Sequence, residues 1–540
     1  DARRGLRATL AVVLGARELP HGARRAVALA RLEVTVRYAP LLRREPALVA
    51  PALRAFLGPH GMRHPSPAVS GRAGYLFCRF VKVFSKGGEL LPHLEEAVNA
   101  VGDLLAPAAE AAGKAAPVGA TVRNAPDDKL YVFEAVGNML GLEAVPEQAQ
   151  ASHTSAVVNL LAGGLAGMDD GGAILAEPAA SAAAAAVTKL CVCVAALSKG
   201  FPKKLLAARP AVAAPLVGAL GLAARATRRL GGGECGGCGA RAACARVAAL
   251  LHRLVEAVGA PALEHVPLVV ELLLSGGEAA DLTSAMTLCG QLATRFRGDA
   301  AAGELVCGAM GRLVPLTVAM VNGGSGSGAE VVGGNGSAVG IVGDAASQNT
   351  EEARVRNELQ KAIIALSFSL TTAALCGALL TPTPAGPPCL DALASLMLTC
   401  AAEHPEMGVR KLCVSTAANM VREWLPRDAN ALVQGFDTFA IDRFAVDACL
   451  QMPLRPGFPL KDAGAAMALG EAAKFLLLVA ERRPERVLAH TQAVLAGSAT
   501  AAEACTLLAG GVGGGPALRK VLTRAGEEAR AAAAPAEAAL

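Results

Sequence analysis

Hydrophobic side chains recur along this chain every three or four positions, which is the spacing of one face of an α-helix. In the segment 70–84 this face carries Leu76, Phe80 and Phe84. The pair Gly87-Gly88 interrupts the pattern, and the segment 89–105 resumes it. We therefore predict two amphipathic helices joined by a tight turn.

The same unit of helix, turn and helix recurs along the chain. An amphipathic pair of this size cannot bury its apolar face alone, so it must stack on neighbouring pairs. Two of the units begin alike, with His64-Pro65 and with His404-Pro405. The repeats are degenerate, as in HEAT solenoids with units of about 40–47 residues. The predicted fold is all-α, an α-solenoid of degenerate HEAT-like helical repeats. Further helices are predicted over residues 25–42, 128–142, 186–200, 244–258, 266–275, 281–296, 304–320, 352–380, 390–403, 407–425, 461–481 and 485–497.

Two segments interrupt the helical pattern. Residues 322–350 are rich in Gly and Ser, a composition typical of a flexible loop, and residues 106–126 form an Ala/Pro/Gly-rich insertion. We predict a HEAT-like array over residues 1–321 that includes this insertion, then the loop at 322–350. The array continues over 351–530, and an Ala-rich tail at 531–540 is expected to fray.

Composition agrees with a helical fold. Of 540 residues, 53% are hydrophobic and 18% are charged, which excludes a mostly disordered chain. Aromatic residues make up only 3%, so Ala, Leu and Val carry the hydrophobicity, as in helical rather than sheet proteins. The segment 362–380 has no charged residue and is about long enough to span a bilayer. Because it is rich in Ala, Ser, Thr and Gly, we interpret it as a buried helix; a polytopic membrane protein is the alternative.

Cysteine spacing indicates buried thiols rather than a disulfide framework. The chain has 14 Cys, most of them single within apolar stretches. Cys235, Cys238 and Cys244, with His252 beyond them, are a candidate zinc cluster. Their spacing matches no common structural zinc module. We favour a flexible loop without metal.

No catalytic motif is present in the sequence. It contains no Gly-x-x-x-x-Gly-Lys-Ser/Thr phosphate loop, no Gly-x-Ser-x-Gly elbow and no His-Glu-x-x-His zinc helix. We therefore predict a binding protein that is not an enzyme and needs no cofactor or metal.

Positive charge is concentrated on particular helix faces. Lys plus Arg number 51 and Asp plus Glu 46, a formal charge of only +5, which excludes a uniformly basic protein. In a solenoid, equivalent faces of successive helices line up, so short basic stripes can combine into a surface that follows a phosphate backbone. Scarce aromatic residues on these faces favour recognition of a double-helical shape over unpaired bases. A merely solvated helix surface is the alternative. The candidates are Arg72, Arg79, Lys82 and Lys86 on one helix, Lys199, Lys203 and Lys204 on another, and Arg410, Lys411 and Arg422 on a third.

Several short motifs, in order along the chain, resemble the exportin-T family of tRNA nuclear export receptors. These motifs are Val36-Arg37-Tyr38, Gly61-Met62-Arg63-His64, the run from Arg72 to Lys82, Leu91 to Glu95, Asp103 to Leu105, Leu130 to Gly137, Leu197 to Phe201, Leu251-His252-Arg253, His404-Pro405 with Arg410-Lys411, Phe444 to Ala463, and Ala468 to Glu471.

This resemblance implies a solenoid of the karyopherin or importin-β superfamily. Such a receptor binds mature tRNA together with the GTP form of Ran, contacts nuclear pore proteins and shuttles between nucleus and cytoplasm. It would release its cargo when the GTP is hydrolysed. We expect the chain, which begins at Asp1 without an initiator Met, to correspond to a C-terminal portion, with the main Ran site in preceding repeats. A HEAT-repeat scaffold or a receptor for protein cargo is the alternative function.

Overall fold

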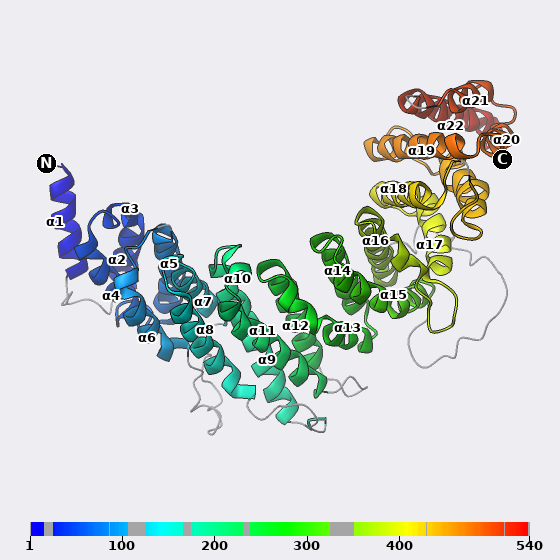
Figure 1. Ribbon diagram of the computed structural model, residues 1–540. Coiled ribbons are helices and arrows are strands. Elements are labelled where there is room, and N and C mark those ends of the chain that lie inside the picture. Colours follow the sequence, from blue (N-terminus) through cyan, green and yellow to red (C-terminus); the bar gives the residue numbers. More distant parts are fainter. Residues whose placement is uncertain are drawn as a thin grey trace. The chain divides into compact units, whose positions relative to one another are not determined.

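The structure, a computed structural model, describes residues 2–15, 25–85, 87–105, 126–165, 174–176, 178–230, 238–323, 350–427, 429–511 and 514–537. Across these ranges the chain is helical and contains no β-strand; its extended pairing is a single bridge between Pro382 and Pro388. Helices stack pair after pair, so the prediction of an all-α solenoid is confirmed (Figure 1). Contacts divide the chain into two compact units, Asp1–Gly276 and Gly277–Leu540.

The first unit is a stack of helices in two layers. In one layer α2, α5, α7, α9 and α12 pack side by side, and in the other α4, α6, α8, α11 and α13 do so. Connections and helix ends include the 3₁₀ segments η1 Pro46–Leu48, η2 Leu91–His93, η4 Gly163–Leu165 and η5 Ala260–His265. The helices are α1 Ala2–Gly15, α2 Arg25–Arg37, α3 Ala39–Leu42, α4 Val49–Leu57, α5 Pro67–Phe84, α6 Leu94–Leu105, α7 Pro126–Leu140, α8 Glu147–Ala162, α9 Ala179–Gly200, α10 Leu205–Ala208, α11 Pro210–Arg228, α12 Cys238–Ala257 and α13 Val266–Ser275.

The second unit repeats this layered plan. One layer contains α14, α16, α18, α19 and α22, and the other contains α15, α17, η8, α20 and α21. Two 3₁₀ segments, η7 Cys376–Leu380 and η9 Met452–Leu454, lie in the connections. The helices are α14 Ala279–Arg295, α15 Ala300–Val321, α16 Glu351–Thr372, α17 Cys389–Glu403, α18 Met407–Trp424, η8 Thr438–Leu450, α19 Ala463–Arg482, α20 Pro484–Val494, α21 Ala501–Ala509 and α22 Gly515–Glu537.

The two His-Pro motifs form the same local structure ahead of a helix. The His64 Nδ1 accepts a hydrogen bond from the Ser66 N–H at 3.0 Å, and the His404 Nδ1 accepts one from the Glu406 N–H at 3.1 Å. Both imidazoles are buried. Because each ring satisfies the N–H of the residue that precedes its helix, the motif fixes how the chain enters α5 and α18.

Three predicted helices differ in detail. The predicted helix over 352–380 is wrong beyond Thr372, where α16 ends, and the chain continues as the separate η7. Ala374 has a φ of 62°, and the Leu375 N–H bonds to the Leu370 carbonyl at 2.9 Å, which is a Schellman C-cap made without glycine. The segment 89–105 begins with the 3₁₀ turn η2 before α6, and the predicted helix over 25–42 is divided at Tyr38 into α2 and α3. The π-helix η8 lies in a stretch for which no helix was predicted.

The core of each unit is built from Ala, Leu and Val around a few aromatic rings. In the first unit the Phe56 ring lies 5.2 Å from that of Phe80, which lies 4.7 Å from that of Phe84. In the second, the Phe444 and Phe475 centroids are 5.3 Å apart. These five rings are fully buried, so each cluster of rings lies within the core of its unit.

The predicted insertion at 106–126 lies outside the described residues except for Pro126, which begins α7, and most of the predicted loop at 322–350 also lies outside them. The backbone of α22 remains helical to Glu537, within the tail that was expected to fray. Four helices, Ala179–Gly200, Pro210–Arg228, Ala300–Val321 and Ala463–Arg482, are long and apolar enough to cross a membrane by length and composition. Between 44% and 61% of their most apolar windows is buried inside the fold.

Candidate nucleic-acid interface

The helix α5 separates an apolar face from a basic face, as predicted. Its apolar side chains, including Leu76, are buried, whereas Arg72, Arg79 and Lys82 are exposed. Lys86, the fourth residue predicted for this stripe, lies outside the described residues. The basic stripe predicted from the helical period is therefore exposed in the folded chain.

A groove of about 740 Å³ runs between α2 and α5 beside this stripe. Three cationic side chains of α5, Arg72, Arg79 and Lys82, share its wall with Arg37 of α2. The acidic residue of the groove is Glu33, whose Oε1 accepts a hydrogen bond from the Arg72 guanidinium at 2.8 Å. The groove thus combines four cationic side chains with one carboxylate, which favours an anionic ligand.

Two tyrosines lie at the basic stripe: Tyr75 on α5 itself and Tyr131 on the neighbouring helix α7. The Arg72 guanidinium lies 4.9 Å from the centroid of the Tyr75 ring, and that of Arg79 lies 5.8 Å from it. The Tyr131 ring of α7 meets Tyr75 edge-on at 5.1 Å and is 40% exposed. The 3.6-residue period places Tyr75 next to both arginines, so its place in the stripe could have been found from the sequence. The approach of Tyr131 depends on the packing of α7 on α5.

A buried carboxylate of α7 joins the basic residues of two neighbouring helices, α5 and α9. Glu134 of α7 has a side chain only 8% exposed, yet it contacts the Lys82 ammonium of α5 at 2.5 Å and the Lys199 ammonium of α9 at 3.4 Å. Burial acts to raise the pKa of Glu134, but the hydrogen bond and charge of Lys82 and the charge of Lys199 outweigh it, so the pKa lies below its ordinary value. The bond to Glu134 in turn raises the pKa of Lys82.

Glycines allow α7 and α9 to approach closely enough for this ion-pair cluster. A Cβ on Gly137 would lie 2.1 Å from the Leu197 carbonyl oxygen, and one on Gly200 would lie 2.4 Å from the Glu134 carbonyl oxygen. Both obstacles are backbone atoms, which cannot turn aside as a flexible side chain can. The two helices therefore cross at a distance that only glycine permits, and this crossing places Lys199 beside Glu134.

The basic surface continues at the C-terminal end of α9. The Arg253 guanidinium of α12 donates a hydrogen bond to the Ser198 carbonyl oxygen at 3.2 Å, which satisfies one of the last carbonyls of α9. Lys203 and Lys204 follow on the exposed turn before α10. The first unit thus brings the α5 and α9 candidates together, with Arg253 as a neighbour that sequence reasoning missed.

The basic candidates of α18 have three different surroundings. Arg410 is buried: its Nε donates to the His404 carbonyl oxygen at 2.6 Å, and its guanidinium lies 5.8 Å from the Phe458 ring centroid. Burial lowers the pKa of Arg410. Lys411 lines a separate groove, and Arg422 is exposed and donates to the Asn419 Oδ1 at 2.8 Å. The prediction that Arg410 belongs to an accessible basic face is therefore wrong, because this side chain supports the entry into its own helix.

The remaining candidate chemistry concerns metal-ligating residues and cysteine thiols. Within the described ranges no group of three or more His, Cys, Asp or Glu side chains could hold a metal ion. The candidate zinc cluster cannot be described as a whole, since Cys235 lies outside those ranges, while Cys244 is buried within α12. Burial raises the pKa of the Cys78 thiol to about 11 and that of Cys289 to about 12. Such thiols stay protonated and are poor nucleophiles.

Comparison of the structure with known structures identifies the class of fold. A structure entitled "Importin13 cytosolic state" matches 98% of this chain and 52% of its own, with a TM-score of 0.58 and 10% sequence identity. At that identity the likeness concerns the fold alone, which is the stacked helical-repeat architecture of an importin.

Sequence comparison then identifies the family. The Exportin-T family model matches residues 12–302, more than half of the chain, and the chain therefore belongs to the exportin-T family. It is 26% identical over 460 residues to Exportin-T of Arabidopsis thaliana, covering 84% of this chain and 43% of that protein. With Exportin-T of Homo sapiens the identity is 24% over 483 residues, covering 85% and 44%. The chain thus spans less than half the length of these relatives, and the resemblance inferred from the short motifs is confirmed.

Proposed function

We propose that this chain is part of a tRNA nuclear export receptor, which binds mature tRNA together with Ran-GTP and carries it through the nuclear pore to the cytoplasm. Membership of the exportin-T family and the importin-like fold support a transport receptor that acts by binding. The observation that carries the RNA part is the basic surface of α5, where exposed arginines lie beside two tyrosines and a cationic groove.

The chemistry of this surface suits a phosphate backbone. Cations that neutralise phosphates release counterions, and this release supplies most of the sequence-independent affinity for nucleic acid. Arg79 and Arg37 offer guanidinium groups that can bind phosphate oxygens in pairs. Lys82 and Lys199 share the charge of Glu134, so they contribute less than two unpaired cations would.

Tyr131 adds an aromatic edge next to this backbone surface. Its exposed ring can stack on an unpaired base, whereas the Tyr75 ring already contacts two guanidinium groups. The proposed surface therefore binds a folded RNA through its phosphates and admits one unpaired nucleotide at its border. Lys203, Lys204 and Arg422 are further candidates for phosphate contacts.

Ran, rather than a reaction on this chain, is proposed to control the release of tRNA and the direction of transport. In this scheme Ran-GTP and tRNA bind together in the nucleus, nuclear pore proteins are contacted during passage, and hydrolysis of GTP on Ran in the cytoplasm lowers the affinity for both. The chain itself would perform no catalytic step.

Binding of tRNA at two salt concentrations tests the RNA part of the proposal. We expect fluorescence anisotropy with labelled tRNA to show an affinity that falls steeply between 50 and 200 mM salt, as phosphate neutralisation requires. The double variant Arg37→Ala/Arg79→Ala should weaken binding several-fold and reduce the salt slope by about 2, because each lost phosphate contact removes about 1. Arg54→Ala is the matched control, since Arg54 is an exposed arginine of α4 in the other layer.

Two results would contradict the assignment of tRNA binding to this surface. One is a tRNA affinity that is independent of salt, and the other is an equal loss of tRNA affinity in the double variant and in the control. Ran-GTP should be present in a parallel series with the full-length receptor, where it should tighten tRNA binding. Absence of tRNA binding there would instead favour the second function, a HEAT-repeat receptor for protein cargo.

A further inference from the structure

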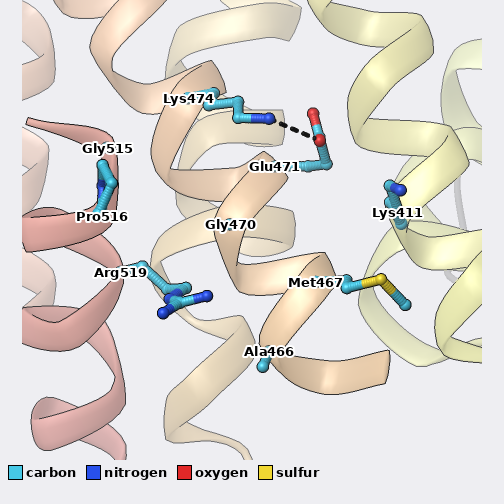
Figure 2. Close-up of a pocket in the computed structure, with 9 residues that line it drawn as sticks. All are labelled: Lys411, Ala466, Met467, Gly470, Glu471, Lys474, Gly515, Pro516 and Arg519. Carbon is cyan, nitrogen blue, oxygen red and sulfur yellow. Dashed lines mark hydrogen bonds and ion pairs between the residues drawn. The ribbon is translucent and has the colours of Figure 1, made fainter. Parts of the chain in front are cut away.

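A second groove, of about 340 Å³, crosses three neighbouring helices of the second unit (Figure 2). Its floor is α19, with α18 on one side and α22 on the other. Three cationic side chains line it, one from each helix: Lys411, Lys474 and Arg519. Within the described part of the chain, Lys411 and Arg519 have no ion pair, whereas Lys474 contacts the Glu471 carboxylate at 3.0 Å.

Small residues open this groove at its centre. A Cβ on Gly470 would lie 3.8 Å from the Arg519 Cδ, and a Cβ on Gly515 would lie 3.9 Å from the Lys474 Cγ. Both Cβ atoms would make ordinary contacts, so packing does not require either glycine. Without side chains, Gly470 leaves the floor open and Gly515 leaves the start of α22 open. Ala466 and Pro516 continue the same low apolar surface.

One large apolar side chain lies on that floor. Met467 is 56% exposed and points from α19 toward the side of α18 that carries Lys411. Exposed methionine is favoured at protein-binding surfaces because its flexible thioether adapts to different partners. An apolar centre surrounded by charged side chains is the arrangement of a protein–protein interface, in which Met and Arg are enriched.

We propose that this groove binds an acidic peptide segment of a partner protein, with one apolar side chain of that segment seated on Met467. Three cations against one carboxylate select a negatively charged ligand. Glu471 argues for a peptide rather than a phosphodiester chain. A peptide supplies N–H donors to a carboxylate, whereas a phosphate backbone offers only acceptors and negative charge to it. The proposal is independent of the basic surface of α5, which lies in the first unit.

A direct binding measurement tests the proposal. The probe is a fluorescein-labelled peptide of about twelve residues, composed of Asp, Glu and Ser around a central Leu, titrated with the full chain at low salt. The double variant Lys411→Glu/Arg519→Glu should weaken binding about tenfold or more, since two attractions from partly exposed side chains become repulsions. Met467→Ser should weaken it about threefold or more by removing apolar contact area.

Matched controls separate the groove from general effects of charge and hydrophobicity. Lys520→Glu changes an exposed lysine next to Arg519 that does not line the groove, and Leu432→Ala removes a side chain that is 71% exposed elsewhere in the unit. Both should bind the probe as the unaltered chain does, and all variants should keep their circular dichroism spectra. A peptide with Lys in place of Asp and Glu should not bind.

Two outcomes would overturn the proposal. One is equal peptide affinity in the groove variants and their controls. The other is loss of affinity for a labelled single-stranded RNA in Lys411→Glu/Arg519→Glu with no loss for the peptide, which would assign the groove to RNA. Neither result bears on the α5 surface, whose variants are measured separately with tRNA.

Discussion

The substitution Glu134→Gln removes the charge on which Lys82 and Lys199 converge while it keeps the size of the side chain. The carboxylate is 8% exposed, and the two lysine side chains are 50% and 65% exposed. Breaking a fully buried pair costs about 3–5 kcal/mol, and an exposed pair is worth about 1 kcal/mol or less. Because the acid is buried and its partners are solvated, we expect a loss of about 1–2 kcal/mol, which multiplies the open population by about 5–30.

Hydrogen exchange measured by mass spectrometry can follow this loss where it occurs. Peptides from α7 and α9 should exchange about 5–30 times faster in the variant, since the cluster joins these helices. Peptides from the second unit should not change. Glu96→Gln is the control, because Glu96 is an exposed acid of α6 in the same unit.

The same cluster predicts the direction of a pH effect. The pKa of Glu134 is lower in the folded protein than its ordinary value of 4.5. Its contribution to stability is therefore complete above that ordinary value and is lost as the pH falls through the folded pKa. The unaltered chain should lose α7 and α9 protection on acidification below about pH 4.5, and Glu134→Gln should lose less. The assigned role of Glu134 is wrong if Glu134→Gln exchanges at neutral pH as the unaltered chain does and loses as much protection of α7 and α9 in acid.

Three further substitutions probe other parts of the fold. Ala374→Gly should raise the free energy of unfolding of the second unit by about 1 kcal/mol in a denaturant titration, because glycine adopts the φ of 62° without strain; a decrease would contradict the C-cap. Arg410→Ala should lower stability by about 1.5–3 kcal/mol, because it removes a charge-assisted hydrogen bond, while tRNA affinity at fixed salt stays unchanged; an affinity loss without a stability loss would return Arg410 to the binding surface. Asp442→Asn weakens the contact with the His490 Nε2 at 2.9 Å and the pairing with Arg486, so thermal unfolding should occur a few degrees lower. Burial acts to raise the pKa of Asp442, but its bonds to His490 and Arg486 hold that pKa below the ordinary value. The difference in melting temperature between the unaltered chain and Asp442→Asn should therefore persist at neutral pH and shrink in acid. Equal melting temperatures at neutral pH would show that the pairing does not stabilise the fold.

Local periodicity was sufficient for much of the fold. The helix 266–275 was predicted with the bounds that the structure gives to α13, and the apolar and basic faces of α5 followed from the spacing of Leu76 and Arg79. The predicted continuous helix over 352–380 failed at Ala374. Glycine is the residue that most often takes the left-handed position after a helix, and here alanine takes it, so no residue signalled the end of the helix.

The candidate surface was only partly predictable, since its decisive contacts join distant positions. The sequence presents Lys82 and Lys199 as equivalent basic residues, and Arg410 as another. The structure pairs the two lysines with Glu134 and buries Arg410 under Phe458. Each of these outcomes depends on which helices become neighbours, and amphipathic spacing carries no information about that.

The sequence by itself determined many of the helices, the solenoid class, the family and the helix faces on which charge gathers, because these depend on short-range spacing and short motifs. Tertiary structure alone decided which charges remain accessible. A charged side chain that meets a buried partner is held by it, as Lys82 is held by Glu134, whereas one over a hollow made by glycines, such as Arg519, stays available to a ligand. The physical reason is that desolvation and pairing are set by neighbours in space, which only the packing of the helices brings together.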